Sequence, residues 1–405
     1  MVHRRATHSL SALAVCAALA ACSGVPEEHA LAAGDPLTES AVAASALSAA
    51  ADHKSRLTHW SPGNYILLNS GAPSTAEVSE RKGLLADAAT MAPFVGLQIE
   101  YDWWLFEGAQ GDYSAGFAAI DADLAAVANA GKKLVIFFQY KNFSGPNAVP
   151  TYLQESGPWC VSQAKGGSVC GQYQMSNGEI AMLWQGSSTG GTADRLHAWV
   201  QAVGAHVAEG AYASSVAGVV FPESACSQGN ISFADVDYTQ TSYLDGLEAD
   251  VTAGGAAFPG TPIFQYINFL PGPDSQESYL ADYAAWAQTH PFAGAGCPDL
   301  APGGSAAGCG FDPPGYSVLL DASVQGTIPF NVAVEAADYG SCRTPSLKDT
   351  YDLGVLPASQ GGMGAQYIAW VDHPHEGTGD VFDLPEVVTY LENAGSFPNT
   401  AKPTW

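Results

Sequence analysis

Two glutamates stand where carboxyl groups could cleave a bond between sugars. Glu223 and Glu335 each follow an apolar run that is typical of a buried β-strand, VAGVVFP and IPFNVAV. Cleavage with retention needs a general acid and a nucleophile on opposite sides of one glycosidic bond, and two carboxyl groups serve in these roles. If both strands belong to one closed barrel, the two side chains can meet at its mouth. The pair therefore predicts a sugar-cleaving barrel in which one carboxyl group is the acid/base and the other is the nucleophile.

An eight-fold alternation of strands and helices would position this pair. Strand-like apolar runs occur at residues 64–70, 94–101, 133–140, 216–222, 262–268, 292–299, 329–335 and 365–371. Most of the intervals between them have helical periodicity, with Gly131 expected to cap one helix end and Asp383 with Glu386 to form a capping box at another. The expected fold class is α/β, a (β/α)8 TIM barrel, with a long insertion after strand three at residues 141–191.

The sixth strand has an alternative. The run at 292–299 is rich in glycine, whereas residues 316–321 (YSVLLD) are more apolar. The second run lies only a few residues before the strand at 329–335, and a crossover between parallel strands needs about a dozen residues. We therefore expect 292–299 to be the strand and 316–321 a short helix.

The N-terminus predicts export. Two arginines, an apolar stretch and the segment Leu19-Ala-Ala-Cys22 resemble a bacterial lipoprotein signal peptide with its lipobox. The resemblance implies a signal peptide at 1–21 and a lipid on Cys22, which would anchor the chain to the cell envelope. Ser23 in the next position favours the outer membrane or cell surface. A plain secretory signal with a chance cysteine is the alternative, and the apolar stretch is too short to remain as a membrane span.

The amino-acid composition distinguishes an N-terminal tether from the domain that follows it. Residues 22–57 are rich in Ala, Ser and Pro and predict a flexible tether, and residues 58–405 predict one barrel domain with catalytic activity. The chain has 40 acidic and 14 basic residues and a formal net charge of -26, which disfavours nucleic acid and anionic membrane surfaces as partners. The membrane is expected only through the lipid anchor. Motifs of serine hydrolases, nucleotide-binding proteins and zinc proteases are absent from the sequence, so no cofactor is predicted.

Six cysteines remain after Cys16 and Cys22 are set aside, an even number that suggests disulfides in an exported chain. Sequence alone leaves 15 pairings open. Local spacing favours three pairs: Cys160 with Cys170, Cys297 with Cys309, and Cys226 with Cys342. The last pair would brace the loops that follow the two glutamates. A Cys-x-x-Cys pattern and finger-like histidines do not occur in the sequence, so no metal site is predicted.

The segment Trp104-Leu-Phe-Glu107-Gly, followed by Asp-Tyr-Ser and a helix that ends in Gly-Lys-Lys, resembles the second barrel unit of many retaining glycoside hydrolases of clan A. In that clan the acid/base, the nucleophile and a tryptophan close strands four, seven and eight, which implies these roles for Glu223, Glu335 and Trp370. The resemblance covers roughly residues 60–395.

One position departs from the clan pattern. The clan usually has asparagine before its acid/base, where it binds the sugar 2-hydroxyl, but this chain has Pro222. Asn230, Asn268 or another polar group would have to make that contact, or the site has drifted from efficient hydrolysis.

Aromatic and polar residues near the strand ends are candidates for carbohydrate binding, because sugar rings present apolar faces beside hydroxyl groups. The predicted substrate-binding residues are Trp104, Tyr140, Tyr266, Asn268, Asp299, Trp370 and His373. Tyr266 could also hold Glu335 in its anionic form through a hydrogen bond. The alternative to an enzyme is a non-catalytic barrel lipoprotein that binds a glycan or a partner protein at the cell surface with the same face.

Overall fold

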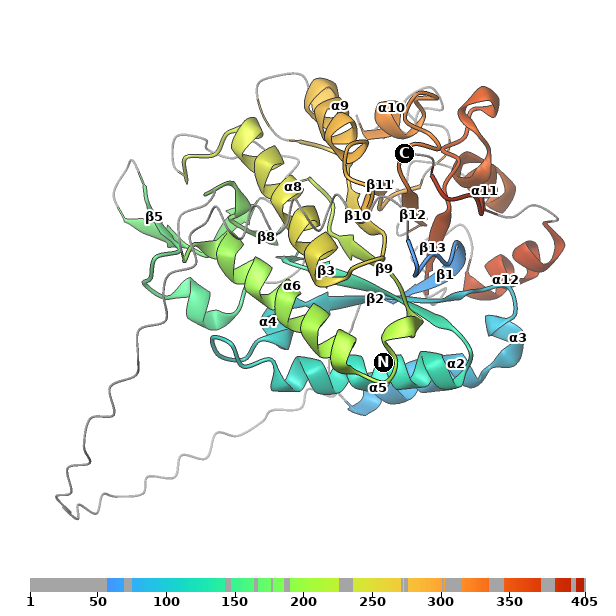
Figure 1. The fold of residues 1–405 in the computed structure, drawn as a ribbon, viewed down its shortest axis with the longest axis horizontal. Helices are drawn as coiled ribbons and strands as arrows, with labels where there is room; N and C mark the ends of the chain where they lie inside the picture. The colour runs from blue at the N-terminus through green and yellow to red at the C-terminus, as the bar shows by residue number, and fades with distance from the viewer. Residues whose placement is uncertain are drawn as a thin grey trace, which may run out of the picture. The chain divides into compact units, whose positions relative to one another are not determined.

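Eight parallel strands close into a barrel in the computed structural model of the protein (Figure 1). The structure describes residues 57–68, 75–142, 147–163, 167–175, 178–185, 190–225, 236–270, 272, 276–300, 302, 315–334, 346–372, 383–394 and 398–403. The barrel strands are β1 (Gly63–Leu68), β2 (Gly96–Asp102), β3 (Lys133–Gln139), β9 (Val216–Phe221), β10 (Ile263–Tyr266), β11 (Ala293–Cys297), β12 (Phe330–Val334) and β13 (Tyr367–Val371). They pair in chain order, and β13 closes the ring on β1. The predicted (β/α)8 barrel is confirmed.

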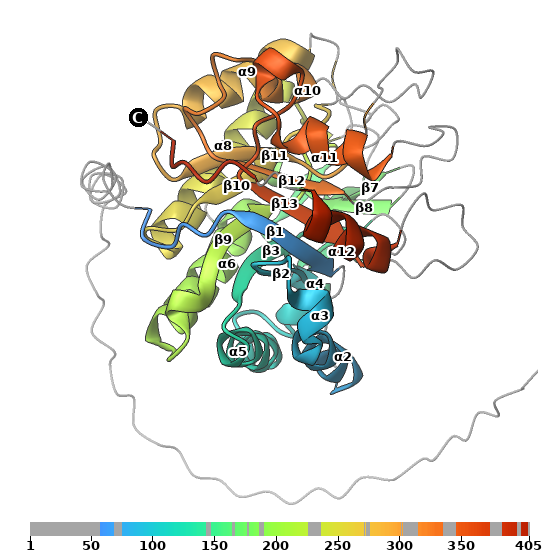
Figure 2. The same cartoon turned by 90° about the vertical axis from the view of Figure 1, so that its right-hand side faces the viewer.

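Helices surround the strands in both views (Figure 1 and Figure 2). They are α2 (Thr75–Ala86), α3 (Ala88–Met91), α4 (Trp103–Phe106), α5 (Ser114–Asn129), α6 (Thr192–Glu209), α8 (Gln240–Ala257), α9 (Gln276–Ala287), α10 (Gly315–Leu319), α11 (Leu347–Val355) and α12 (Leu384–Asn393), with 3-10 turns η2 (Thr151–Gln154), η3 (Leu183–Gln185), η4 (Ala213–Ser215) and η6 (Ala358–Gln360). Gly131 follows α5 with a φ of 67°, a conformation that glycine adopts easily. The Asp383–Glu386 capping box of α12 is also present. Residues 293–297 form the sixth strand and α10 is the short helix, as predicted.

Both faces of each barrel strand are buried, which explains why these strands are nearly continuous apolar runs. The larger apolar cluster lies between strands and helices, and a smaller one fills the barrel interior. Within the interior, β10 contributes the rings of Phe264 and Tyr266. The adjacent strand β11 has glycine at the facing positions: a Cβ on Gly294 would lie 2.8 Å from the Phe264 ring, and one on Gly296 would lie 2.7 Å from the Tyr266 ring. Glycine in β11 therefore makes room for the rings of β10 and also for the backbone oxygens of Pro329 and Asn331, which a Cβ would approach even more closely.

The predicted insertion follows β3 and has its own strands. β4 (Lys141–Asn142), β8 (Gly178–Ala181) and β7 (Gln172–Met175) form a small antiparallel sheet. Beside it, β5 (Cys160–Ser162) and β6 (Ser168–Cys170) form a hairpin that the Cys160–Cys170 disulfide closes. This disulfide was predicted from spacing and is confirmed.

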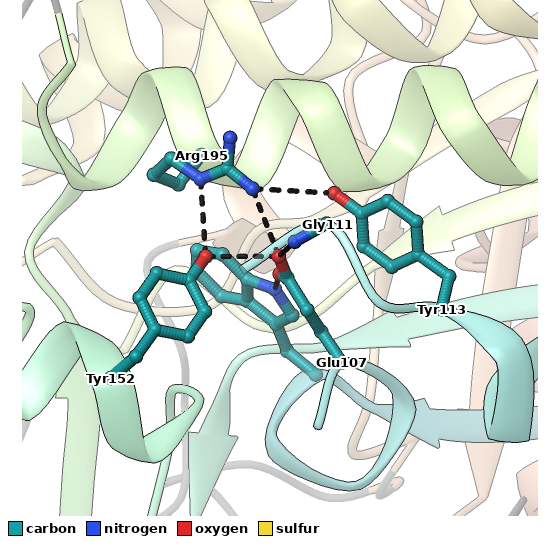
Figure 3. Close-up of polar contacts among 6 residues, drawn as sticks. Glu107, Gly111, Tyr113, Tyr152 and Arg195 are labelled. Atoms are coloured by element: carbon teal, nitrogen blue, oxygen red, sulfur yellow. Dashed lines mark hydrogen bonds and ion pairs between the residues drawn. The ribbon is translucent and has the colours of Figure 1, made fainter. Parts of the chain in front are cut away.

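A buried carboxylate ties the insertion to the barrel's outer layer (Figure 3). Glu107, whose side chain is 0% exposed, accepts hydrogen bonds from Trp103 Nε1 at 2.8 Å and Gly111 N at 2.7 Å. It also accepts from Tyr152 OH at 3.0 Å and from Arg195 Nη2 at 2.9 Å. Tyr152 belongs to η2 of the insertion and Arg195 to α6. We call these five residues the Glu107 latch. The glutamate of the Trp104–Glu107 motif thus has a structural role here.

The predicted Cys297–Cys309 disulfide is wrong. Cys297 is a free, fully buried thiol at the end of β11, and its Sγ donates to the carbonyl oxygen of Asp299 at 3.5 Å. The sulfur points into the packed layer between strand and helices, so burial rather than sequence spacing decides its state. Cys309, Cys226 and Cys342 lie outside the described residues, as do Cys22 and the predicted signal and tether. Among the helices that the structure describes, none is long and apolar enough to cross a membrane.

Candidate functional site

The ends of the barrel strands bring the proposed acid/base to the mouth. Glu223 lies two residues after the last residue of β9, the fourth barrel strand, and is half-buried. Glu335 directly follows Val334, the last residue of β12, and is outside the described residues. Val334 itself pairs with Trp370 of β13 and forms a bridge with Asp299. Because all eight strands are parallel, both glutamates follow strands at the same end of the barrel.

Asn268 holds the carboxyl group of Glu223. The Asn268 Oδ1 accepts from Ala225 N at 3.0 Å and from Phe269 N at 2.8 Å, which fixes the orientation of the amide. Its Nδ2 therefore faces Glu223 and donates to Oε2. Burial raises the pKa of Glu223 above its ordinary value, while Lys141 and this hydrogen bond act in the opposite direction. The result is a fixed carboxyl group that tends to keep its proton, as a general acid must.

Lys141 brings a positive charge from the insertion to the same place. Its side chain is almost fully buried, and its Nζ donates to the carbonyl oxygen of Ala225 at 2.5 Å. The ammonium group lowers the proton affinity of Glu223. Through Lys141 of β4, the insertion therefore contributes a positive charge at the mouth of the barrel.

Glu100 is a site residue that the sequence analysis missed. Gln98 points into the barrel, since its amide contacts Tyr266 OH at 2.8 Å and Asn331 Nδ2 at 3.0 Å. Side chains alternate along a strand, so Glu100 lies on the same inner face, one layer nearer the mouth. There its Oε1 accepts from Gln139 Nε2 of β3 at 2.9 Å. Because alternate residues of a strand share a face, Glu100 could have been inferred from the sequence as the next inward-facing residue of β2 after Gln98.

The carboxyl groups at the mouth favour their neutral forms. The pKa of Glu100 is raised to about 8, first by burial and then by the charges of Asp102 and Glu223. The pKa of Asp102 is raised to about 6, mainly by burial and further by Glu77. Acidic groups near the end of β2 therefore hold protons close to neutral pH.

Two predicted aromatic ligands lie on the outer face of the barrel instead. Trp370 is 1% exposed, donates from Nε1 to Asn64 Oδ1 at 3.1 Å and stacks on Tyr351 of α11. Tyr140 is fully buried and donates to Asp250 Oδ2 of α8 at 3.0 Å. Both rings belong to the layer between strands and helices. Both side chains are therefore part of the core.

The remaining candidates are spread along the mouth and beneath it. Tyr266 lies inside the barrel and donates to Asn331 Oδ1 at 3.1 Å, four residues before Glu335. Asp299 is 8% exposed, and its carbonyl oxygen accepts from Tyr316 OH. Trp104 is half-buried in α4, directly after β2. His373 is outside the described residues. Within the described part of the chain, His, Cys, Asp and Glu side chains form no group suited to a metal ion.

The solved structures that align with this chain include sugar-cleaving enzymes. No protein-family model matches the sequence, and no curated protein matches it. A β-galactosidase from Rahnella sp. R3 aligns with a TM-score of 0.51 at 10% identity, over 84% of this chain and 57% of the other. The endo-glycoceramidase II of Rhodococcus sp. aligns with a TM-score of 0.48 at 13% identity, over 82% and 78% of the two chains.

A third structure is the exo-β-1,4-mannosidase Op5Man5 from Opitutaceae bacterium strain TAV5, with a TM-score of 0.41 at 12% identity. The alignment covers 82% of this chain and 60% of the mannosidase, so the chain spans less than two thirds of that enzyme's length. At 10% identity the alignment with the β-galactosidase shows a shared fold and nothing further.

Proposed function

We propose that this protein is a retaining glycoside hydrolase that cleaves a poly- or oligosaccharide, with Glu223 as acid/base and Glu335 as nucleophile. The observation that carries the proposal is the setting of Glu223 after the fourth barrel strand. There its carboxyl group is half-buried, fixed by Asn268 and raised in pKa. The glycosidases among the solved structures with this fold support the same class.

The chemistry follows from the two carboxyl groups. Glu223 donates its proton to the glycosidic oxygen while the Glu335 carboxylate attacks the anomeric carbon, which gives a glycosyl-enzyme and releases the leaving sugar. Glu223, now ionised, then removes a proton from the water that attacks this intermediate. Burial favours the protonated form that the first step needs, and the charge of Lys141 favours the ionised form that the second step needs.

Asn268 could make the substrate contact that Pro222, the residue before Glu223, cannot make. Pro222 has no side-chain donor, but the Asn268 amide reaches Glu223 from the next barrel strand. One hydrogen of Nδ2 points to Glu223, and an amide nitrogen carries two. We assign the second hydrogen to the sugar 2-hydroxyl, so that Asn268 both orients the acid/base and contacts the substrate.

The place of action is also part of the proposal. The lipobox at Leu19–Cys22 supports export and lipidation at Cys22, with the barrel carried on the tether of residues 22–57 at the outer membrane or cell surface. A surface-anchored hydrolase of this kind would meet its carbohydrate outside the cell.

The test uses the full chain with Cys22→Ser, which prevents lipidation, against a panel of polysaccharides and aryl glycosides. We expect Glu335→Gln to abolish turnover of every substrate. Glu223→Gln should slow polysaccharide cleavage by roughly 10²–10⁴-fold, the usual size of a general-acid contribution. For aryl glycosides with good leaving groups kcat/KM should change much less, because their departure needs little protonation, whereas kcat should still fall because the second step has lost its base.

A matched control is Glu248→Gln, which changes a carboxyl group on α8 outside the barrel and should leave turnover unchanged. Glycan binding without turnover in the unsubstituted chain, unaltered by either glutamate substitution, would instead identify the non-catalytic binding barrel.

A further inference from the structure

The proposed acid/base lies in a short turn, residues 222–225, which we call the acid/base turn. Ser224 fastens this turn to the end of β10, and its side chain is 0% exposed. Its N donates to the carbonyl oxygen of Tyr266 at 2.8 Å, and its Oγ donates to that of Phe269 at 2.7 Å. The same Oγ accepts from Asn268 N at 3.1 Å. The middle of the turn is therefore held by the chain that follows β10.

The insertion holds the last residue of the acid/base turn. The side chain of Lys141 is 2% exposed, and its Nζ donates to the carbonyl oxygen of Ala225 at 2.5 Å. A hydrogen bond from a charged donor is roughly twice as strong as a neutral one, and burial keeps water from competing for it. The N–H of Ala225 donates to Asn268 Oδ1 at 3.0 Å. Ala225 is thus bound at its N–H by Asn268 and at its carbonyl oxygen by Lys141.

Three contacts lead from Lys141 to the proposed acid/base. The ammonium group bonds the carbonyl oxygen of Ala225, whose N–H bonds Asn268 Oδ1. The Nδ2 of the same amide donates to Glu223 Oε2. An amide side chain is planar, so a shift of Ala225 that turns the Asn268 amide also turns the donor that faces Glu223. The position of Ala225 therefore affects the orientation of the carboxyl group.

The position of Lys141 depends on the small sheet of the insertion. Lys141 pairs with Ile180 of β8, and the N–H of Ala181 donates to the carbonyl oxygen of Tyr140 at 3.1 Å. The N–H of Lys141 donates to Gln139 Oε1 at 3.1 Å. The backbone from which the lysine side chain extends is thus fixed by the pairing of β4 with β8.

We propose that Lys141 is a positioning residue of this site, through which the insertion sets the orientation of the Glu223 carboxyl group. The proposal rests on the glycosidase function proposed above. Lys141 acts through the Ala225 carbonyl group and the Asn268 amide and needs no contact with the substrate. Its removal should therefore affect the catalytic step more than the binding of the substrate.

The first test compares Lys141→Met with the matched control Lys133→Met, in an assay with an aryl glycoside that has a poor leaving group. Methionine keeps most of the apolar stem and removes the donor. Lys133 begins β3, and its Nζ also donates to a backbone carbonyl oxygen, that of Ser214 at 2.8 Å. The value of kcat is taken from the plateau of the pH profile of each variant, so that a changed pKa of Glu223 does not enter the comparison.

We expect Lys141→Met to lower kcat by roughly 10–100-fold at a nearly unchanged KM, because a misplacement of about 1 Å can cost about 10²-fold in rate. Lys133→Met should leave both constants unchanged. Lys141→Leu, which also lacks a donor, serves in the same comparison if Lys141→Met folds poorly. A kcat equal to that of the Lys133→Met control would overturn the proposal while leaving the glycosidase function intact.

A second measurement does not depend on turnover. In the full chain with Cys22→Ser, the hydrogen exchange of the Ser224 and Ala225 amides is followed by NMR. Both amides donate hydrogen bonds that hold the acid/base turn, so both should exchange roughly tenfold faster or more in Lys141→Met. The amide of Val219 within β9 should exchange as in the wild type, because it belongs to the barrel.

The two measurements separate the two proposals. If the protein cleaves no glycoside, the proposed function fails, and the exchange rates still decide whether Lys141 positions the acid/base turn. Faster exchange of the turn alone supports the proposal. Equal exchange rates of the turn in Lys141→Met and Lys133→Met overturn it.

Discussion

The Glu107 latch gives the sharpest prediction about stability. Arg195→Met keeps most of the apolar stem but removes the cation that faces a carboxylate of 0% exposure, while the arginine itself is 17% exposed. Glu107 would keep its bonds from Trp103 and Gly111 but would pair with no positive charge among the residues that the structure describes. We therefore expect a large destabilisation that starts where the insertion meets the barrel.

The expected loss of stability follows from the burial of this ion pair. Removing one partner of a buried ion pair typically destabilises by about 3–5 kcal/mol. An unfolding entropy of roughly 2.1 cal/mol/K per residue gives about 0.7 kcal/mol/K for a domain of residues 58–405. The Tm of Arg195→Met should thus fall by about 4–7 °C.

The assay is calorimetry or thermal unfolding by circular dichroism, with Lys348→Met as the control. Lys348 pairs with Asp352 on α11, but its side chain is 68% exposed, so this change should move Tm by about 1 °C or less. Adding Glu107→Gln to Arg195→Met should recover part of the loss, because a neutral amide needs no counter-charge. An Arg195→Met protein as stable as the Lys348→Met control would refute the reasoning.

Further predictions concern pH and the disulfide. Glu100 and Asp102 have native pKa values of about 8 and about 6, above their ordinary values of 4.5 and 3.8, so the folded state binds more protons than the unfolded chain between these limits. Stability should fall as the pH rises through that window, and a series of Tm values from pH 4 to 9 should show a flatter dependence for Glu100→Gln. Removing the Cys160–Cys170 disulfide, which spans a sequence separation of 10, should loosen the β5–β6 hairpin by roughly 3 kcal/mol on the loop-closure model. Limited proteolysis should then cut the hairpin about 100-fold faster at an unchanged barrel Tm, and an equal rate in the double Cys→Ser variant would contradict this.

The barrel strands were predictable from sequence because a parallel strand covered on both sides must be apolar throughout. Even residues 293–297 were found, since the distance to the next strand excluded the alternative run. The helix of residues 192–209 lies in one of the intervals between strands where helical periodicity predicted a helix. Local patterns therefore sufficed wherever the determining contacts lie within one element.

The direction of individual side chains was harder to predict. Trp370 and Tyr140 are at strand ends, but continuous apolar strands do not reveal which face looks inward, and both rings point to the helices. The Cys297 thiol likewise points from its strand towards the helices, so it lies in the core instead of in a loop. Glu100 escaped notice because its partners come from β3 and β9, which only the closed barrel brings beside β2. Glu223 and Asn268 were chosen as candidates because each stands at the end of a clear apolar run.

The glycines of β11 and the rings of β10 have a consequence for how this protein can change over generations. A Cβ on Gly296 would lie 1.8 Å from the backbone oxygen of Asn331, and one on Gly294 would lie 2.5 Å from the backbone oxygen of Pro329, closer in both cases than the ring of β10. A lone methyl group added on β11 collides with its neighbours, and a lone ring removed from β10 leaves a void. Because no change of side chain in β10 can move the backbone oxygens of Pro329 and Asn331, both glycines should be retained over generations, and any redesign of the barrel interior has to keep them.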